Sequence, residues 1–159
     1  MLEGERLVTV SAPLHQIPIL VRAGSIIPFA SPDIETLAAD LAGTQYKTLD
    51  NGLIWRVFAS SALSASKGSF TVYDGTKAST EQDSSRILVK GESSTIRHYE
   101  IVVNLEQPPR EVLLAGKRLE KLDDSGYHAD RTGWWFDPDA KTMNALFLAS
   151  DFALEVTKH

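Results

Sequence analysis

Short apolar segments separated by turn residues fill the chain from Tyr46 onward. Apolar residues alternate with polar ones in several of these segments, and this period of two predicts β-strands. Asp-Gly and Ala-Gly pairs or prolines follow them, which predicts hairpin turns and strand ends. Roughly eight strands at regular spacing predict an all-β fold, an antiparallel β-sandwich. The expected strand segments are residues 53–59, 69–75, 86–91, 98–105, 110–119 (a hairpin), 142–150 and 152–157.

The pattern of residues 6–29 predicts an extended segment punctuated by proline. Pro13, Pro18 and Pro28 cannot donate a hydrogen bond to a sheet, so each marks the end of a strand or an edge. Two strands are expected in this region, in residues 7–11 and 17–22.

A helical pattern occurs once, in the segment SPDIETLAADLAG. Ser31 or Asp33 can cap its start, apolar residues recur at helical spacing, and Gly43 can close it. We therefore expect one short helix near residues 33–42, which links two β regions.

Composition excludes several classes of function. The net charge of −5 disfavours nucleic acid as a partner, because phosphates are held mainly by lysine and arginine. The chain contains no cysteine, which removes disulfides and thiolate zinc sites. Its apolar runs are far shorter than the ~20 residues that cross a bilayer, and its start does not resemble a signal peptide. We expect a soluble protein of unknown location, without a membrane partner.

The segment APLHQIPILVRAGSIIPF is more specific than a generic strand requires. It resembles the segment that closes the β-sandwich after the catalytic barrel in glycoside hydrolase family 31, the α-glucosidases and α-xylosidases. His15 stands where an acidic residue is more usual. The residues that fit the family pattern are Ala12, Pro13, Leu14, Ile17, Pro18, Val21, Arg22, Ala23, Gly24, Ser25, Ile26, Ile27 and Pro28.

Later segments resemble the distal β-sandwich of the same family, in the same order. One departure is a single aspartate before the glycine of the first turn, where the family has two. The matching residues are Phe70, Val72, Tyr73, Asp74 and Gly75; then Pro108, Pro109, Val112, Gly116 and Lys117; then Gly133, Trp134, Phe136 and Asp137.

The resemblance implies a division of the chain and a division of labour. Residues 1–31 would be terminal strands of an incomplete proximal sandwich, residues 32–45 a helical linker, and residues 46–159 the distal sandwich. Family members are retaining enzymes whose two catalytic aspartates lie on an upstream barrel. Neither that barrel nor its aspartate motifs occur in this sequence, so no catalytic residue carries over and the chain is not expected to be an enzyme on its own.

The remaining acidic and histidine residues do not predict a catalytic or metal site. Asp123-Asp124 and Asp137-Pro138-Asp139 lie among turn formers, which favours Asx turns over acid catalysis or a calcium site. The histidines are too far apart in sequence to bind a metal together. We expect no cofactor and no metal; the histidines are His15, His98, His128 and His159.

Trp134, Trp135 and Asp137 are the candidate carbohydrate-binding residues. In a strand, Trp134 faces one way and Trp135 the other, so one indole could remain exposed. An exposed tryptophan beside a carboxylate is a common sugar-binding arrangement in β-sandwich modules. Packing in the core is the alternative role of these rings.

Three functions are consistent with these patterns. The first is a noncatalytic C-terminal accessory domain of a family 31 α-glycosidase that braces the upstream barrel. The second is a carbohydrate-binding module, and the third is a freestanding interaction domain. A further expectation is that the apolar segment from Ile17 to Phe29 folds back on the distal sandwich or pairs two chains as a homodimer, because an uncovered strand edge seeks a partner.

Overall fold

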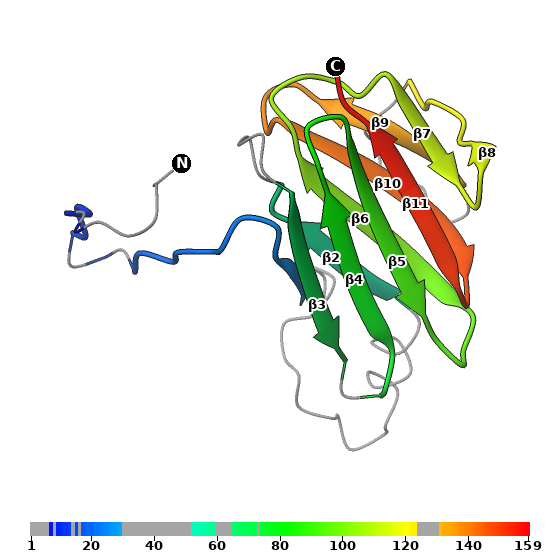
Figure 1. The fold of residues 1–159 in the computed structure, drawn as a ribbon, viewed down its shortest axis with the longest axis horizontal. Helices are drawn as coiled ribbons and strands as arrows, with labels where there is room; N and C mark the ends of the chain where they lie inside the picture. Colours follow the sequence, from blue (N-terminus) through cyan, green and yellow to red (C-terminus); the bar gives the residue numbers. More distant parts are fainter. Residues whose placement is uncertain are drawn as a thin grey trace.

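Two β-sheets packed face to face form the body of the molecule (Figure 1). The computed structural model describes residues 7, 9–13, 15, 17–29, 52–59, 65–72, 74–123 and 131–159. Eleven strands and no helix occur within these residues. The all-β sandwich predicted from the sequence is therefore confirmed.

The sheets have five and six strands. The first has the order β1 (Ile26–Phe29), β2 (Gly52–Val57), β6 (Arg97–Asn104), β10 (Thr142–Ala149) and β9 (Gly133–Asp137). The second has the order β3 (Ser66–Thr71), β4 (Lys77–Gln82), β5 (Arg86–Glu92), β11 (Phe152–Thr157), β7 (Glu111–Leu114) and β8 (Lys117–Arg118). All pairings are antiparallel except that of β2 with β6, which is parallel.

Most strands from residue 52 onward lie where the sequence predicts them, but several details differ. The strand expected in residues 69–75 is β3, which begins earlier, at Ser66, and ends at Thr71. β4 was not predicted, because its sequence KASTEQ has no apolar alternation. Gly91 was expected to end a strand, whereas it lies inside β5 opposite Phe152. Arg56 is exposed, so β2 is well buried on one face only.

The two strands expected in residues 7–11 and 17–22 are not formed. The described residues of both segments are irregular. The described residues between 7 and 22 form an extended segment, here called the arm, that leaves the sandwich (Figure 1). The first strand of the molecule is β1, four residues beyond the end of the second expected strand. Residues 17–22 have strand-like composition, yet among the described residues no neighbouring strand offers them hydrogen bonds, and a strand needs such a partner.

The expected helix near residues 33–42 lies outside the described residues. β1 comes from the segment assigned by resemblance to a proximal sandwich, and it pairs with β2, Ile26 lying opposite Val57. The division of the chain into domains remains a prediction. No helix in the described part of the chain is long and apolar enough to cross a membrane.

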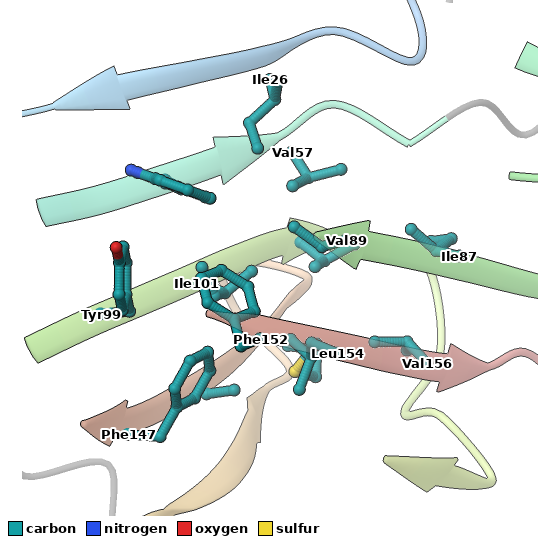
Figure 2. Packing of buried hydrophobic residues seen from close by; sticks show 14 of the residues in the cluster. Ile26, Val57, Ile87, Val89, Tyr99, Ile101, Phe147, Phe152, Leu154 and Val156 are labelled. Carbon is teal, nitrogen blue, oxygen red and sulfur yellow. The ribbon is translucent and has the colours of Figure 1, made fainter. Parts of the chain in front are cut away.

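A cluster of four aromatic rings lies between the sheets. Trp55, Tyr99 and Phe147 come from the five-stranded sheet, and Phe152 enters from the six-stranded sheet. Ring centroids are 4.8 Å apart for Tyr99 and Phe152, 4.8 Å for Phe147 and Phe152, and 5.0 Å for Trp55 and Tyr99. Figure 2 shows Phe152 beside Tyr99 and Phe147, with Ile101 and Leu154 packed next to them. Such contacts stabilise the sandwich beyond simple area burial.

The two lateral edges of the sandwich differ. At one edge, residues 119–122, which follow β8, lie against β9: the N–H of Trp134 donates to the carbonyl of Glu120 (2.8 Å), and the N–H of Leu122 donates to the carbonyl of Trp134 (2.7 Å). This segment closes that edge. At the other edge, β1 and β3 are the outermost strands of their sheets, and no strand from the described part of the chain joins them.

The arm is attached at the open edge through Gly24. Gly24 has a φ of +86°, and a Cβ at this position would lie 2.4 Å from the Ser66 hydroxyl. The carbonyl oxygen of Gly24 accepts a hydrogen bond of 2.7 Å from Thr80 Oγ1 and lies close to Gly68, where a Cβ would be 2.3 Å away. Glycine is therefore required here both by backbone conformation and by close approach.

Replacing Gly24 tests this attachment. We expect Gly24→Ala to lower the free energy of unfolding by more than Gly116→Ala does. Gly116 also has a positive φ, +76°, but open space around it, so its substitution costs only the backbone strain of about 1–2 kcal/mol. Gly24→Ala adds the steric conflict, about 1–3 kcal/mol. Urea denaturation of both variants measures the difference, and equal losses would show that the contacts of Gly24 do not matter.

Candidate functional site

The candidate carbohydrate-binding residues Trp134, Trp135 and Asp137 all lie on β9, the edge strand at the closed side of the sandwich. Trp134 faces the interior, and Trp135 faces the opposite side of the sheet, as the alternation predicts. Both indoles are buried, with exposed fractions of 6% and 9%. Neither therefore presents the exposed plane that would distinguish a sugar-binding face.

Trp134 is held by its surroundings at the closed edge. Its Nε1 donates to the carbonyl of Leu119 (3.2 Å), and Lys121 Nζ lies 5.6 Å from the ring centroid, within range of a cation–π contact. A groove of about 410 Å³ borders this ring. Its other lining residues are Pro109, Arg110, Glu111, Val112, Arg118 and Glu120.

Trp135 belongs to a second, small apolar cluster with Leu122 and Leu146, on the outer face of the five-stranded sheet. Leu122 also covers Gly133, where a Cβ would lie 2.6 Å from the leucine side chain. The segment that follows β8 thus packs, through Leu122, on the face that Trp135 occupies.

Asp137 caps the turn between β9 and β10. Its Oδ1 accepts the backbone N–H groups of Asp139 and Ala140, both at 2.9 Å. This is the Asx turn expected from the sequence. The chain after it adopts a positive φ at Lys141, whose ammonium pairs with Glu106 at 2.6 Å.

The other acidic and histidine residues are dispersed. Asp123 and Asp139 are exposed, as are His15, His98 and His159. Asp124 and His128 lie outside the described residues. Within the residues that the structure describes, no group of three histidine, aspartate or glutamate side chains is placed to hold a metal ion.

An ion pair that the sequence did not reveal joins Asp74, which is exposed to solvent, to the buried Arg97. Arg97 Nη2 lies 2.7 Å from Asp74 Oδ2, and the arginine is only 5% exposed. Asp74 also accepts the backbone N–H of Thr76 (2.9 Å). Burial works to raise the pKa of Asp74, but the hydrogen bonds from Thr76 and the guanidinium of Arg97 outweigh it and lower the pKa.

Three buried donors lie near this ion pair or beside the aromatic cluster. Trp55 Nε1, Arg97 Nε and the Tyr99 hydroxyl have no hydrogen-bond partner in the described part of the chain. Burial raises the pKa of Tyr99. The positive charge of Arg97 opposes this rise, as does the nearby Ser93 hydroxyl, which does not reach hydrogen-bond geometry.

Glu100 is a half-buried carboxyl group on the outer face of the five-stranded sheet. In the register of the sheet it lies between Ile54 and Leu146. Burial raises its pKa, and the charge of Arg56 acts in the opposite direction. The only sequence signal for this burial was the position of Glu100 in the alternating segment HYEIVV, which places it on the outer face of a strand. A charged residue there becomes desolvated when its cross-strand neighbours are apolar.

These groups do not form the pair of carboxyl groups that a retaining glycosidase needs, about 5 Å apart. Asp74 is neutralised by Arg97, Asp137 is committed to a turn, and the charge acting on Glu100 is that of Arg56. The described residues therefore present a structural polar network and one groove beside an aromatic ring.

Comparison with solved structures identifies the fold. The chain matches a GH31 dextranase from Flavobacterium johnsoniae with a TM-score of 0.69 and 16% identity, over 98% of this chain and 21% of the dextranase. It matches the cycloalternan-forming enzyme from Listeria monocytogenes with a TM-score of 0.65 and 21% identity, over 86% of this chain and 13% of that enzyme. No protein-family model and no curated protein matches. The chain thus has the fold of one part of these enzymes and spans about a fifth of the dextranase.

The Asp74–Arg97 pair makes a testable contribution to stability. We expect Asp74→Asn to lower the free energy of unfolding by about 3 kcal/mol at pH 7, because it leaves a buried guanidinium without a counterion. The folded-state pKa of Asp74 lies below its ordinary value of 3.8, so the stabilisation is fully present above that value and is lost as the pH falls through the folded-state pKa. The difference in the free energy of unfolding between the variant and the parent protein should therefore become smaller at acidic pH.

Asp137→Asn is the matched control. Its side-chain oxygen can still accept the turn hydrogen bonds, so we expect a change within about 0.5 kcal/mol at every pH. Urea denaturation between pH 2.5 and 7 measures both variants. A loss for Asp74→Asn that does not depend on pH would contradict the assignment.

Proposed function

We propose that this chain is a noncatalytic C-terminal accessory domain of a glycoside hydrolase family 31 enzyme, packed against the catalytic barrel of that enzyme. The observation that carries the proposal is the fold match, which takes in 98% of this chain but only 21% of the dextranase. The family segment at residues 12–28 supports it independently, because its Arg-Ala-Gly-Ser turn has a physical role in the structure.

The arrangement of acidic residues supports a noncatalytic role. Retaining hydrolysis of α-glucosides or α-xylosides, the activity that the resemblance implies for the parent enzyme, requires a nucleophile and an acid/base held together. The carboxyl groups described above are single, paired with cations or bound in turns. The chemistry is therefore assigned to the barrel, and the sandwich provides a rigid support.

The outer face of the five-stranded sheet is a suitable surface for that support. Ile54, Leu148 and the half-buried Glu100 lie on it, and Leu148 is 55% exposed. The outward face of a sandwich that only meets water is normally polar. Apolar side chains here fit a contact with a neighbouring domain.

Two measurements test the proposal. The purified chain should not hydrolyse nitrophenyl α-glucoside or α-xyloside. Sequencing of the DNA upstream is expected to reveal a region that encodes the barrel, which can then be co-expressed with this chain. We expect the barrel and the chain to co-purify, and the melting temperature of the barrel to rise when the chain is bound. Leu148→Asp should weaken this association, because it places a charge in the apolar contact. Turnover by the chain alone that Glu100→Gln abolishes would contradict the proposal.

Carbohydrate binding is the second candidate function, and the groove beside Trp134 is the observation that favours it. Trp134, with Trp135 and Asp137 on the same strand, would then contact a sugar. Under the accessory-domain proposal we expect no change in the NMR signals of the indole N–H groups when glucose or isomaltotriose is added. A saturable shift of the Trp134 signal alone would support the binding module instead.

A further inference from the structure

Most of the exposed large apolar side chains among the described residues lie on the arm and on the edge strands β1 and β3 beside its base. Of the nine large hydrophobic residues that are exposed among the described residues, seven lie on the arm, on β1 or on β3. The arm alone contributes five. The seven are Leu7, Val10, Ile17, Ile19, Leu20, Phe29 and Phe70. A concentration of this kind marks an interaction surface.

The base of the arm is fixed, while its apolar part is free. The N–H of Gly24 donates to the carbonyl of Phe58 (2.6 Å), and the N–H of Ser25 donates to the carbonyl of Arg22 (3.1 Å). Beyond this turn the chain runs away from the sandwich (Figure 1). Ile17, Ile19 and Leu20 are 87%, 81% and 71% exposed. The arm is thus an extended apolar segment held in a set direction.

A groove separates the arm from β3. It has a volume of about 560 Å³ and is open to solvent. Arg22, which is exposed and whose guanidinium has no partner in the described part of the chain, lies on its wall. Ile19, Leu20, Ile27, Lys67 and Ser69 also line the groove. A groove bounded by an extended segment and an edge strand can receive another extended segment.

We propose that two copies of this chain associate through their arms. Residues 17–21 of the two copies pair as antiparallel strands around a two-fold axis at Ile19, and each arm lies in the groove of the other copy. The pairing edge carries the N–H groups of Ile17, Ile19 and Val21. Pro18 has no N–H and lies on the other edge with Leu20, so a third strand cannot add there. The association therefore closes as a dimer.

A second copy is the occupant that the chain itself specifies. An antiparallel pair of identical strands is self-complementary, as a two-fold interface requires. Burial of four aliphatic side chains per copy, those of Ile17, Ile19, Leu20 and Val21, at roughly 100 Å² each, gives a total of about 800 Å², which is the size of a weak, transient interface. Such an interface predicts association at micromolar concentration.

Sedimentation velocity over a range of concentrations tests the association. We expect a reversible dimer with a Kd in the micromolar range, and at least a tenfold weaker Kd for the double variant Ile19→Ser/Leu20→Ser. Ile96→Ser is the matched control, because Ile96 is also exposed, at 64%, but lies in the turn between β5 and β6. Its Kd should stay within twofold of the parent. All three side chains are exposed, so we expect unchanged melting temperatures.

The absence of cysteine allows a test of the geometry. Residues directly opposite in a hydrogen-bonded antiparallel pair have Cα atoms about 5.5 Å apart, which suits a disulfide. Under mild oxidation, Ile19→Cys should form a covalent dimer at least tenfold faster than Ile96→Cys. A mixture of Ile17→Cys and Val21→Cys should form the heterodimer in preference to either homodimer, because these positions face each other across the axis.

Several results would overturn the proposal. They are a monomer at every concentration, a dimer that the double variant does not weaken, or equal crosslinking at positions 19 and 96. The proposal does not depend on the accessory-domain function, since it concerns the arm and the groove beside β3. Failure to bind a barrel and failure to dimerise are therefore separate outcomes.

Discussion

The insertion of the Phe152 ring among three rings of the opposite sheet is the contact on which the sandwich depends. Phe152 stands on β11 and meets Trp55, Tyr99 and Phe147, which come from three neighbouring strands of the other sheet. The ring fits because the residue beside it is Gly91: a Cβ there would lie 2.2 Å from the phenyl ring. A glycine in a strand interior usually weakens a sheet, but here it makes room for a ring that contacts three rings of the other layer.

The sequence predicts the fold class well because the turns are local. The Asp-Gly turn at Gly75 and the Ala-Gly hairpin at Gly116 lie where their residues indicate, both with positive φ. Strand pairing is not local. The irregular arm contains more β-branched and apolar residues than β4, yet β4 is a strand because β3 and β5 flank it. The parallel pairing of β2 and β6 likewise depends on residues far apart in the chain.

The candidate site was predictable only in part, for the same reason. Alternation along β9 correctly separated Trp134 from Trp135, and the Asx turn at Asp137 followed from its neighbours. Burial of both rings depends on residues 119–122, which a linear pattern does not place against β9. The Asp74–Arg97 pair joins a hairpin turn to the start of β6, so neither residue has a local signal of the other. The desolvated Glu100 could be found only once its cross-strand neighbours were known.

The position of β11 has a consequence for the cooperativity of the fold. This strand lies between β5 and β7, and its neighbour in sequence, β10, lies between β6 and β9. Two strands joined by only Ser150 and Asp151 thus occupy interior positions in both layers. Neither sheet is complete without its member of this pair, so the two layers should unfold together in a single transition.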